Sequence, residues 1–183
     1  MRFFLVAILF VFLNAKQTPT DLGDKSIVYL FKHNYYSYLC THRWKYINQY
    51  LGKREDLLSV VAYACLKKHY LTYALDLAKN LRYTKEGRAN STYIISLFTI
   101  KNFLARYILD NFDLTSLKLP DIESDDLGKV FNLVKIQKPK IVNNKILLKN
   151  NDLNISVNYN LKTNEIIIKF FKNGELIKKD RYW

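Results

Sequence analysis

The spacing of apolar residues changes along the chain and divides it into three parts. Residues 3–13 form an unbroken apolar run. From residue 26 to about 112, apolar residues recur at three- and four-residue steps without any proline, which predicts amphipathic helices. From Gly128 onward, β-branched residues and period-two alternation predict strands. The pattern therefore predicts an α+β fold, in which an N-terminal region of αα-hairpins precedes a C-terminal antiparallel β-meander.

Breaks in these patterns place the expected elements. The helical stripes are interrupted at Gly52, at residues 84–87 and at residues 111–120. Residues 130–137 and 141–148 are predicted strands separated by Pro139, and residues 154–159 and 165–172 are two further strands. Asn173-Gly174 predicts a tight hairpin between the last of these and the residues from Leu176 onward, because both turn positions need positive φ. The acidic residues 121–126 are predicted to be a linker or a helix start.

The beginning of the chain has the pattern of a secretory signal peptide. Met1-Arg2 is a short positive start, residues 3–13 are an apolar core too short to cross a bilayer, and Ala15 is a small residue suited to cleavage. We expect cleavage after Ala15 and export; an ordinary buried N-terminal strand or helix is the alternative. Abundant Asn, Lys and Ile suggest a bacterial product of an AT-rich genome, which makes the periplasm the expected compartment; a eukaryotic secreted protein is the minor alternative.

Together these signals divide the chain into five segments. They are a signal peptide at 1–15, an N-terminal linker at 16–25, a helical repeat-like domain at 26–120, an acidic linker at 121–127 and an antiparallel β domain at 128–183.

A strong positive charge narrows the expected partners. The formal net charge is +13, and removal of the signal peptide lowers it to +12. Export argues against nucleic acid, which leaves an acidic protein, an anionic envelope polymer or lipid head groups; a plain solvated lysine surface is the alternative. The region from Gly128 onward holds twelve Lys/Arg and four Asp/Glu, so we expect a basic face there. The lysines expected to be exposed are Lys135, Lys149, Lys169, Lys172, Lys178 and Lys179, and the first four are candidate partner-binding residues. Protection of a sheet edge from pairing with another chain is the alternative role for some of them.

Cys40 and Cys65 are the two cysteines of the chain. They lie almost symmetrically about Gly52, so two antiparallel helices meeting there would bring them to the same height. In an exported protein this favours a disulfide over two buried thiols. A zinc site formed by the two cysteines together with His42 and His69 is a more specific alternative, but Cys40 and His42 are two residues apart and do not share a helix face. We expect the disulfide and no metal.

No catalytic motif is visible. No Ser lies in a Gly-x-Ser-x-Gly elbow, and neither cysteine is flanked like a protease nucleophile. Paired carboxylates can meet only in space, so the sequence leaves them open. We expect a protein that is not an enzyme and has no cofactor. Twelve of the fourteen tyrosines lie between Tyr29 and Tyr107, where they serve either an interface or a helix interior. Tyr36 and Tyr73 are the candidate interface tyrosines.

The helical region contains an internal similarity. Residues 32–39 (KHNYYSYL) resemble residues 68–75 (KHYLTYAL) about 35 residues later, and residues 100–105 are a fainter copy. Helix pairs with a period near 34 are typical of tetratricopeptide repeats, and residues 26–112 resemble that family. The family's Trp, Gly and closing Pro are missing, so a plain helical bundle is the alternative. The resemblance implies stacked αα-hairpins whose concave face binds another protein.

The expected function follows from export, helical repeats and a small β domain. This organisation resembles parts of envelope-spanning machines, and it is similar to the small periplasmic proteins that build the accessory disks of flagellar motors in spiral bacteria. We therefore expect a non-catalytic periplasmic adaptor or structural subunit that binds a protein partner. The alternative is a soluble binding module or inhibitor that acts on cell-wall glycan or on a wall hydrolase.

Overall fold

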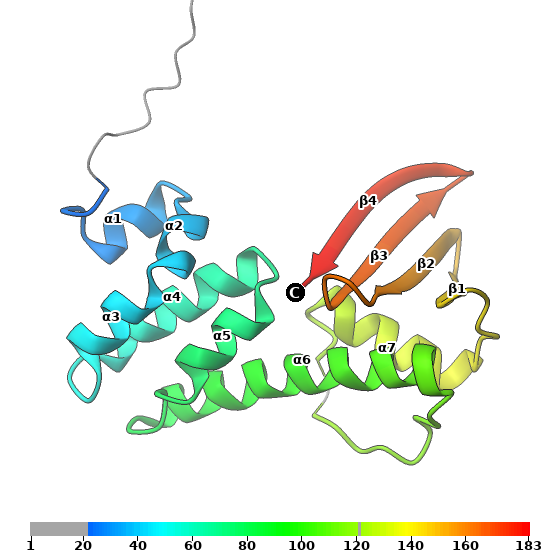
Figure 1. Ribbon diagram of the computed structural model, residues 1–183, viewed down its shortest axis with the longest axis horizontal. Helices are drawn as coiled ribbons and strands as arrows, with labels where there is room; N and C mark the ends of the chain where they lie inside the picture. The colour runs from blue at the N-terminus through cyan, green and yellow to red at the C-terminus, as the bar shows by residue number, and fades with distance from the viewer. Residues whose placement is uncertain (1–21, 121) are drawn as a thin grey trace, which may run out of the picture.

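The computed structural model describes residues 22–120 and 122–183. Helices dominate the first part and a four-stranded antiparallel sheet ends the chain, so the predicted α+β fold is confirmed (Figure 1). The predicted signal peptide and its cleavage site lie outside the described residues. The elements are α1 (Ile27–Lys32), α2 (Tyr36–Thr41), α3 (Arg43–Tyr50), α4 (Glu55–Lys67), α5 (Leu71–Ala78), α6 (Lys85–Asp110), α7 (Asp126–Gln137), β1 (Lys145–Asn150), β2 (Leu153–Asn160), β3 (Glu165–Lys172) and β4 (Glu175–Tyr182).

The internal sequence similarity corresponds to one kind of turn that the chain uses twice. Asn34 follows α1 and His69 follows α4, and both have positive φ, 60° and 55°. After each of them, the backbone N–H of the next residue, Tyr35 or Tyr70, donates to the carbonyl five positions back. Each turn reverses the chain and leads directly into the next helix. The helices differ in length, from the 6 residues of α1 to the 26 of α6, and the tetratricopeptide assignment stays a prediction.

The long helix α6 joins the two parts of the molecule (Figure 1). Its first half contributes Ile94 to a core shared with α1–α5, while Leu97, Ile100 and Leu104 belong to the core beneath the sheet. The boundary between the two cores therefore falls within α6. None of the described helices is both long and apolar enough to cross a membrane.

The sheet has the strand order β1-β2-β3-β4, with every neighbouring pair antiparallel. The predicted Asn173-Gly174 hairpin is confirmed, since both residues have positive φ, 51° and 85°. Alternate residues of the strands point to an inner face that packs on α6 and α7, and this face carries Ile146, Leu148, Ile155, Val157, Ile166, Ile168 and Phe170. The opposite face, which we call the outer face, is not covered by these helices (Figure 1).

The predicted strand at 130–137 is wrong, because this segment lies in α7. Its β-branched residues suggested a strand, but Leu127, Val130, Phe131 and Val134 follow helical spacing and are all buried. The acidic segment before it is a helix start: the Asp125 side chain accepts from the Leu127 N–H at 2.9 Å. The strand predicted at 141–148 is shifted, since β1 begins at Lys145.

Close packing fixes α7 against the rest of the sheet part. A Cβ atom at Gly128 would lie 2.0 Å from the Ile122 carbonyl oxygen, so only glycine allows this approach. The hydroxyl of the buried Tyr182 in β4 donates to Asp125 at 2.9 Å. The end of β4 and the start of α7 are thereby joined at one carboxylate.

Candidate binding surfaces

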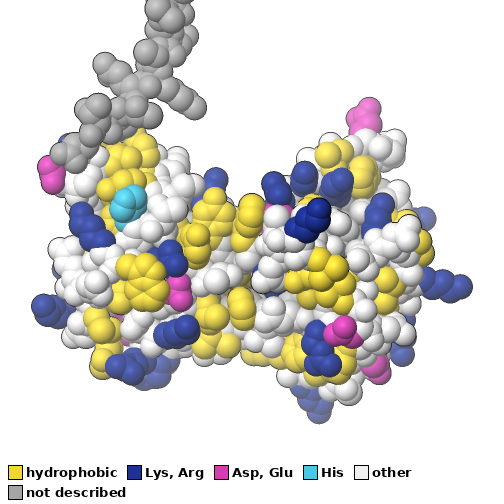
Figure 2. Space-filling view, viewed as in Figure 1, with side chains coloured by type: hydrophobic (Ala, Val, Ile, Leu, Met, Phe, Trp, Pro, Cys, Tyr) yellow, Lys and Arg dark blue, Asp and Glu magenta, His cyan; other side chains and the backbone are white. Residues whose placement is uncertain are grey.

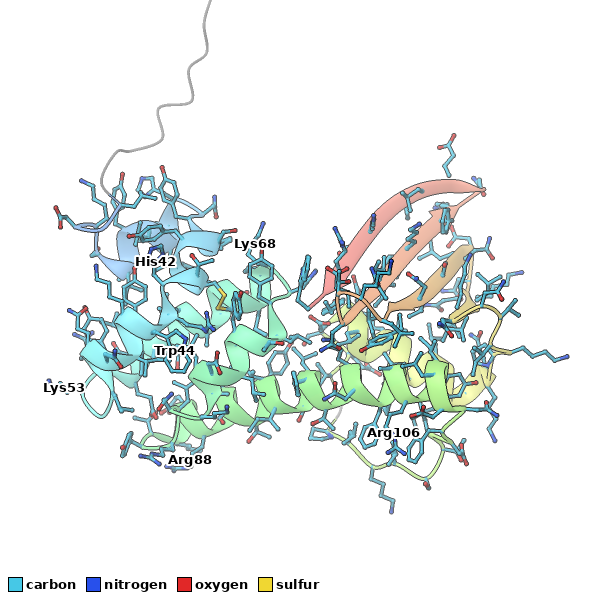
Figure 3. The ribbon with its side chains drawn as sticks, in the orientation of Figure 1. His42, Trp44, Lys53, Lys68, Arg88 and Arg106 are labelled. Atoms are coloured by element: carbon cyan, nitrogen blue, oxygen red, sulfur yellow. A yellow bond between two sulfur atoms is a disulfide. The ribbon has the colours of Figure 1, made fainter. Side chains whose placement is uncertain are left out.

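The predicted disulfide between Cys40 and Cys65 is confirmed (Figure 3). The two Cα atoms are 5.0 Å apart, and the bridge joins α2 to α4. The chain bends at His42, which ends α2 and begins α3, so Cys40 does not lie on the helix that turns back at Gly52. The pairing of the two cysteines was therefore predicted correctly. The helices on either side of Gly52 are α3 and α4, whereas the bridge joins α2 to α4. Because the bridge uses both sulfur atoms, neither thiolate is free to bind zinc.

The outer face of the sheet is rich in lysine. The strand register aligns three rows across it: Lys145–Asn158–Ile167–Arg181, Leu147–Ser156–Lys169–Lys179 and Lys149–Asn154–Phe171–Leu176. In the central row, Lys169 and Lys179 are directly opposite each other on β3 and β4. Figure 2 shows blue side chains gathered over the sheet. The predicted basic face is present.

Four carboxylates of this region pair with other cations. Lys178, whose side chain lies on the inner side, pairs with Asp126 and Asp180. Asp152 pairs with Lys172, and the buried Glu165 pairs with Arg181 at 2.9 Å. Among the described residues, no carboxylate lies within 4.0 Å of the ammonium groups of Lys145, Lys149, Lys169 or Lys179. We call these four residues the lysine face.

The structure separates the four lysines that the sequence named as partner-binding candidates. Lys149 and Lys169 come together on the lysine face. Lys172 is held by Asp152 at 2.9 Å, and this contact raises its pKa. Lys135 lies on α7, where it is partly buried and donates to the Leu117 carbonyl at 2.7 Å. Lys178 and Lys179 are exposed as expected, whereas Lys169, which was also expected to be exposed, is half-buried.

The two candidate tyrosines have different surroundings. Tyr36 is half-buried and packs on Phe31 with 5.1 Å between ring centroids. Tyr73, on α5, lies beneath the Arg43 guanidinium at 3.8 Å. Tyr36 belongs to the edge of the helical core, and Tyr73 borders a small groove shared with Tyr70 and Trp183. The structure does not bring the two tyrosines into one surface.

A larger cleft of 740 Å³ lies between α4, α6 and the segment before α7. Its wall includes Tyr63, Tyr93, His69 and Asp125. The His69 ring stacks on Tyr182 with centroids 4.3 Å apart. Burial, together with the charge of Asp125, raises the pKa of Tyr182 well above its ordinary value, which keeps the phenol protonated. His69 therefore acts here as a stacking partner for a neutral, buried ring.

Comparison of the chain with protein-family models, with curated proteins and with solved structures finds no match. The assignment of function therefore depends on the surfaces themselves. The sequence had suggested Lys149, Lys169 and Tyr73 as candidates, which stay predictions, but it did not predict the Lys169–Lys179 pair or the contact of Tyr70 with Trp183. The strand alternation together with the Asn173-Gly174 hairpin carried the signal for the lysine pair. No local signal could reveal a contact between Tyr70 and Trp183, which are far apart in the sequence.

Proposed function

We propose that this chain is an exported, non-catalytic adaptor that binds an acidic protein partner across the lysine face. The observation that carries the proposal is the pair of Lys169 and Lys179, which face each other without a carboxylate beside them. Like charges directly opposite each other on neighbouring strands lower stability. Binding of an anionic surface would explain why this destabilising pair is present, because the bound anions would neutralise the two ammonium groups.

Two further features support a protein partner. The outer face of the sheet also presents apolar side chains beside these lysines, among them Leu147, which is 65% exposed, and Leu176, which is 53% exposed. Apolar groups between cations fit a folded acidic surface, where charge pairs surround apolar contacts. The disulfide supports an oxidising compartment. The partner belongs to an envelope-spanning complex, and the accessory scaffold of a flagellar motor is the first such complex to test.

The test uses charge reversal with a matched control. A photo-reactive amino acid at Leu147 should crosslink an acidic envelope protein in intact cells of the source bacterium. Lys169→Glu with Lys179→Glu should abolish this product. Lys53→Glu with Lys85→Glu makes the same change in charge on the helical part, where both lysines are exposed (Lys53 is labelled in Figure 3), and should leave the product unchanged.

A second measurement separates protein from lipid. Poly-L-glutamate and vesicles containing phosphatidylglycerol are offered to the purified chain at increasing salt concentration. Binding to polyglutamate should weaken as salt passes about 0.15 M, where charges more than about 8 Å apart are screened, and the lysine-face reversal should remove it. Crosslinks that survive the reversal, or binding to vesicles alone, would contradict the proposal.

A further inference from the structure

A small aromatic groove lies where the helical part meets the end of β4. Its volume is 370 Å³, at the lower end of the range of ligand pockets, about 300–1,000 Å³. Three aromatic residues line it: Tyr70, Tyr73 and Trp183. Its polar lining consists of Thr41, Thr72, Thr163 and Asn164. We call this feature the aromatic groove; Figure 1 shows the end of β4 beside α5.

The three rings are arranged as a corner rather than a stack. Tyr70 meets Trp183 at an interplanar angle of 82° and Tyr73 at 69°, with centroids 6.2 Å and 5.7 Å apart. Trp183 and Tyr73 keep 37% and 36% of their surface exposed. The groove therefore offers aromatic surface in more than one plane.

Arginines hold the two exposed rings in place. The Arg43 guanidinium lies 3.8 Å from the Tyr73 centroid, and that of Arg181 lies 5.1 Å from the Trp183 ring. Each cation lies within cation–π distance of its ring. Each guanidinium is also neutralised: Arg43 pairs with Asp76 at 2.8 Å, and Arg181 with Glu165 at 2.9 Å. The surroundings of the groove are thus electrically balanced, in contrast to the lysine face.

The backbone beside the rings is fixed as well. The Trp183 N–H donates to the His69 carbonyl at 3.0 Å, and the Trp183 carbonyl accepts from the Thr72 N–H at 3.4 Å. A ring that is already positioned loses little conformational freedom when a ligand binds, which favours affinity.

The polar groups of the groove are neutral, and two of them are exposed hydroxyls. Thr41 donates to the carbonyls of its own helix, whereas the exposed side-chain hydroxyls of Thr72 and Thr163 make no hydrogen bond to another described residue. The Asn164 carbonyl oxygen accepts from the Tyr159 hydroxyl at 2.6 Å, which leaves its amide nitrogen free to donate. Hydroxyl and amide groups around exposed rings match the hydroxyls and C–H faces of a sugar.

We propose that the aromatic groove binds a neutral saccharide of one or two rings, such as a segment of a glycan. The sugar stacks an apolar face on Trp183 or Tyr73 and exchanges hydrogen bonds with Thr72, Thr163 and Asn164. No charged side chain is among the residues that line the groove, and the two guanidinium groups that lie against its rings are paired with Asp76 and Glu165, which favours a neutral ligand. This site is separate from the lysine face and does not depend on the proposed function.

The test titrates the full disulfide-bonded chain with chitotriose, cellotriose and maltotriose. Trp44→Phe leaves Trp183 as the single tryptophan, because the chain has two, so fluorescence then reports on the groove. At least one of these saccharides should give a saturable change. Trp183→Ala and Tyr73→Ala, followed by calorimetry, should each weaken binding about tenfold or more. Tyr83→Ala is the control, since Tyr83 is an exposed ring outside the groove that also lies beside an arginine, Arg82.

Several outcomes would overturn the inference. They are the absence of saturable binding of all three saccharides, binding that both groove variants retain, and saturable binding of a neutral peptide in place of the sugars. A variant counts only if its melting curve and its circular dichroism match the parent chain, and Trp183→Phe provides a conservative second variant that should keep part of the affinity. Lys169→Glu with Lys179→Glu should leave sugar binding unchanged, so failure at one site is distinguishable from failure at the other.

Discussion

The helical part and the sheet part are stabilised in different ways. The helical core contains many small residues, such as Ala62, Ala64, Ala74 and Ala78, and several of its helices are only 6 to 8 residues long. Helices this short are marginal by themselves, and a covalent bridge joins two of the elements. The sheet part instead buries large β-branched and aromatic side chains against α6 and α7.

The comparison also extends to how each part uses its charges. In the helical part, buried or half-buried charged groups such as Glu55 and Asp76 hold elements together. On the outer face of the sheet, four lysines hold nothing together. Charge in the first case is structural, and in the second it lies beside no carboxylate of the described residues. Substitutions of the structural charges and of the outer-face lysines should therefore change the free energy of unfolding by different amounts.

Removal of the disulfide should have the largest effect. The bridge spans 25 residues, for which the chain-entropy account gives about 3 kcal/mol of stabilisation. Cys40→Ser with Cys65→Ser should lower the free energy of unfolding by that amount. Hydrogen exchange should show lost protection in α2 and α4, with protection in β2 and β3 largely kept. Equal loss in all four elements would mean that the two parts unfold as one unit.

Loss of the Glu55 carboxylate should have the next largest effect. Glu55 is buried at the start of α4 and accepts the N–H groups of Tyr83 and Thr84 at 2.8 and 2.7 Å, together with the Thr84 hydroxyl. Glu55→Ala leaves these donors unpaired and should cost about 2 kcal/mol. Burial alone would raise the pKa of Glu55, but these hydrogen bonds outweigh it and hold the pKa below its usual 4.5.

The lowered pKa of Glu55 determines how its contribution to stability depends on pH. Because the pKa of Glu55 is lower in the folded chain, its contribution is complete above about pH 4.5 and is lost as pH falls through the folded pKa. Denaturant titrations should show the Glu55→Ala deficit shrinking in acid. Gly87 supplies a check, since a Cβ there would lie 2.3 Å from the Glu55 carboxylate. Gly87→Ala should destabilise the parent but stabilise the Glu55→Ala variant, by up to about 1 kcal/mol.

Lys101 is a buried charge in the middle of α6 that has no hydrogen-bond partner among the described residues. Burial lowers its pKa from 10.5, and the nearby Glu165 only partly opposes this. The unfolded chain therefore binds more protons than the folded one, and stability should rise as pH approaches 10.5. Lys101→Met should stabilise the protein by about 1 kcal/mol at pH 7 and should remove this rise. Lys85→Met, on the exposed start of the same helix, should change neither quantity.

Local patterns predicted the elements better than they predicted the surfaces. Helical stripes, the 165–172 strand and the Asn173-Gly174 hairpin were readable because each depends on neighbouring residues. At residues 130–137 the valine and isoleucine residues favoured a strand, while the spacing of the apolar residues also fitted a helix. This segment forms α7, which has an N-cap at Asp125. The lysine face required the register of four strands. The aromatic groove required the docking of β4 against the α4–α5 turn, which hydrogen bonds between distant backbone groups determine.

The smallest effect should come from the lysine pair, and its sign is the sharpest test of the comparison. Lys179→Glu places a carboxylate opposite Lys169 and turns a repulsive cross-strand pair into an attractive one. Chemical denaturation should show a gain of about 0.2–1 kcal/mol, and the gain should shrink in high salt, because Lys179 is exposed and Lys169 is only partly buried. The same substitution should weaken binding of polyglutamate. A variant that is more stable yet binds less would show that the sheet part keeps its lysines for a partner, whereas a loss of stability would give Lys179 the structural role that charges have in the helical part.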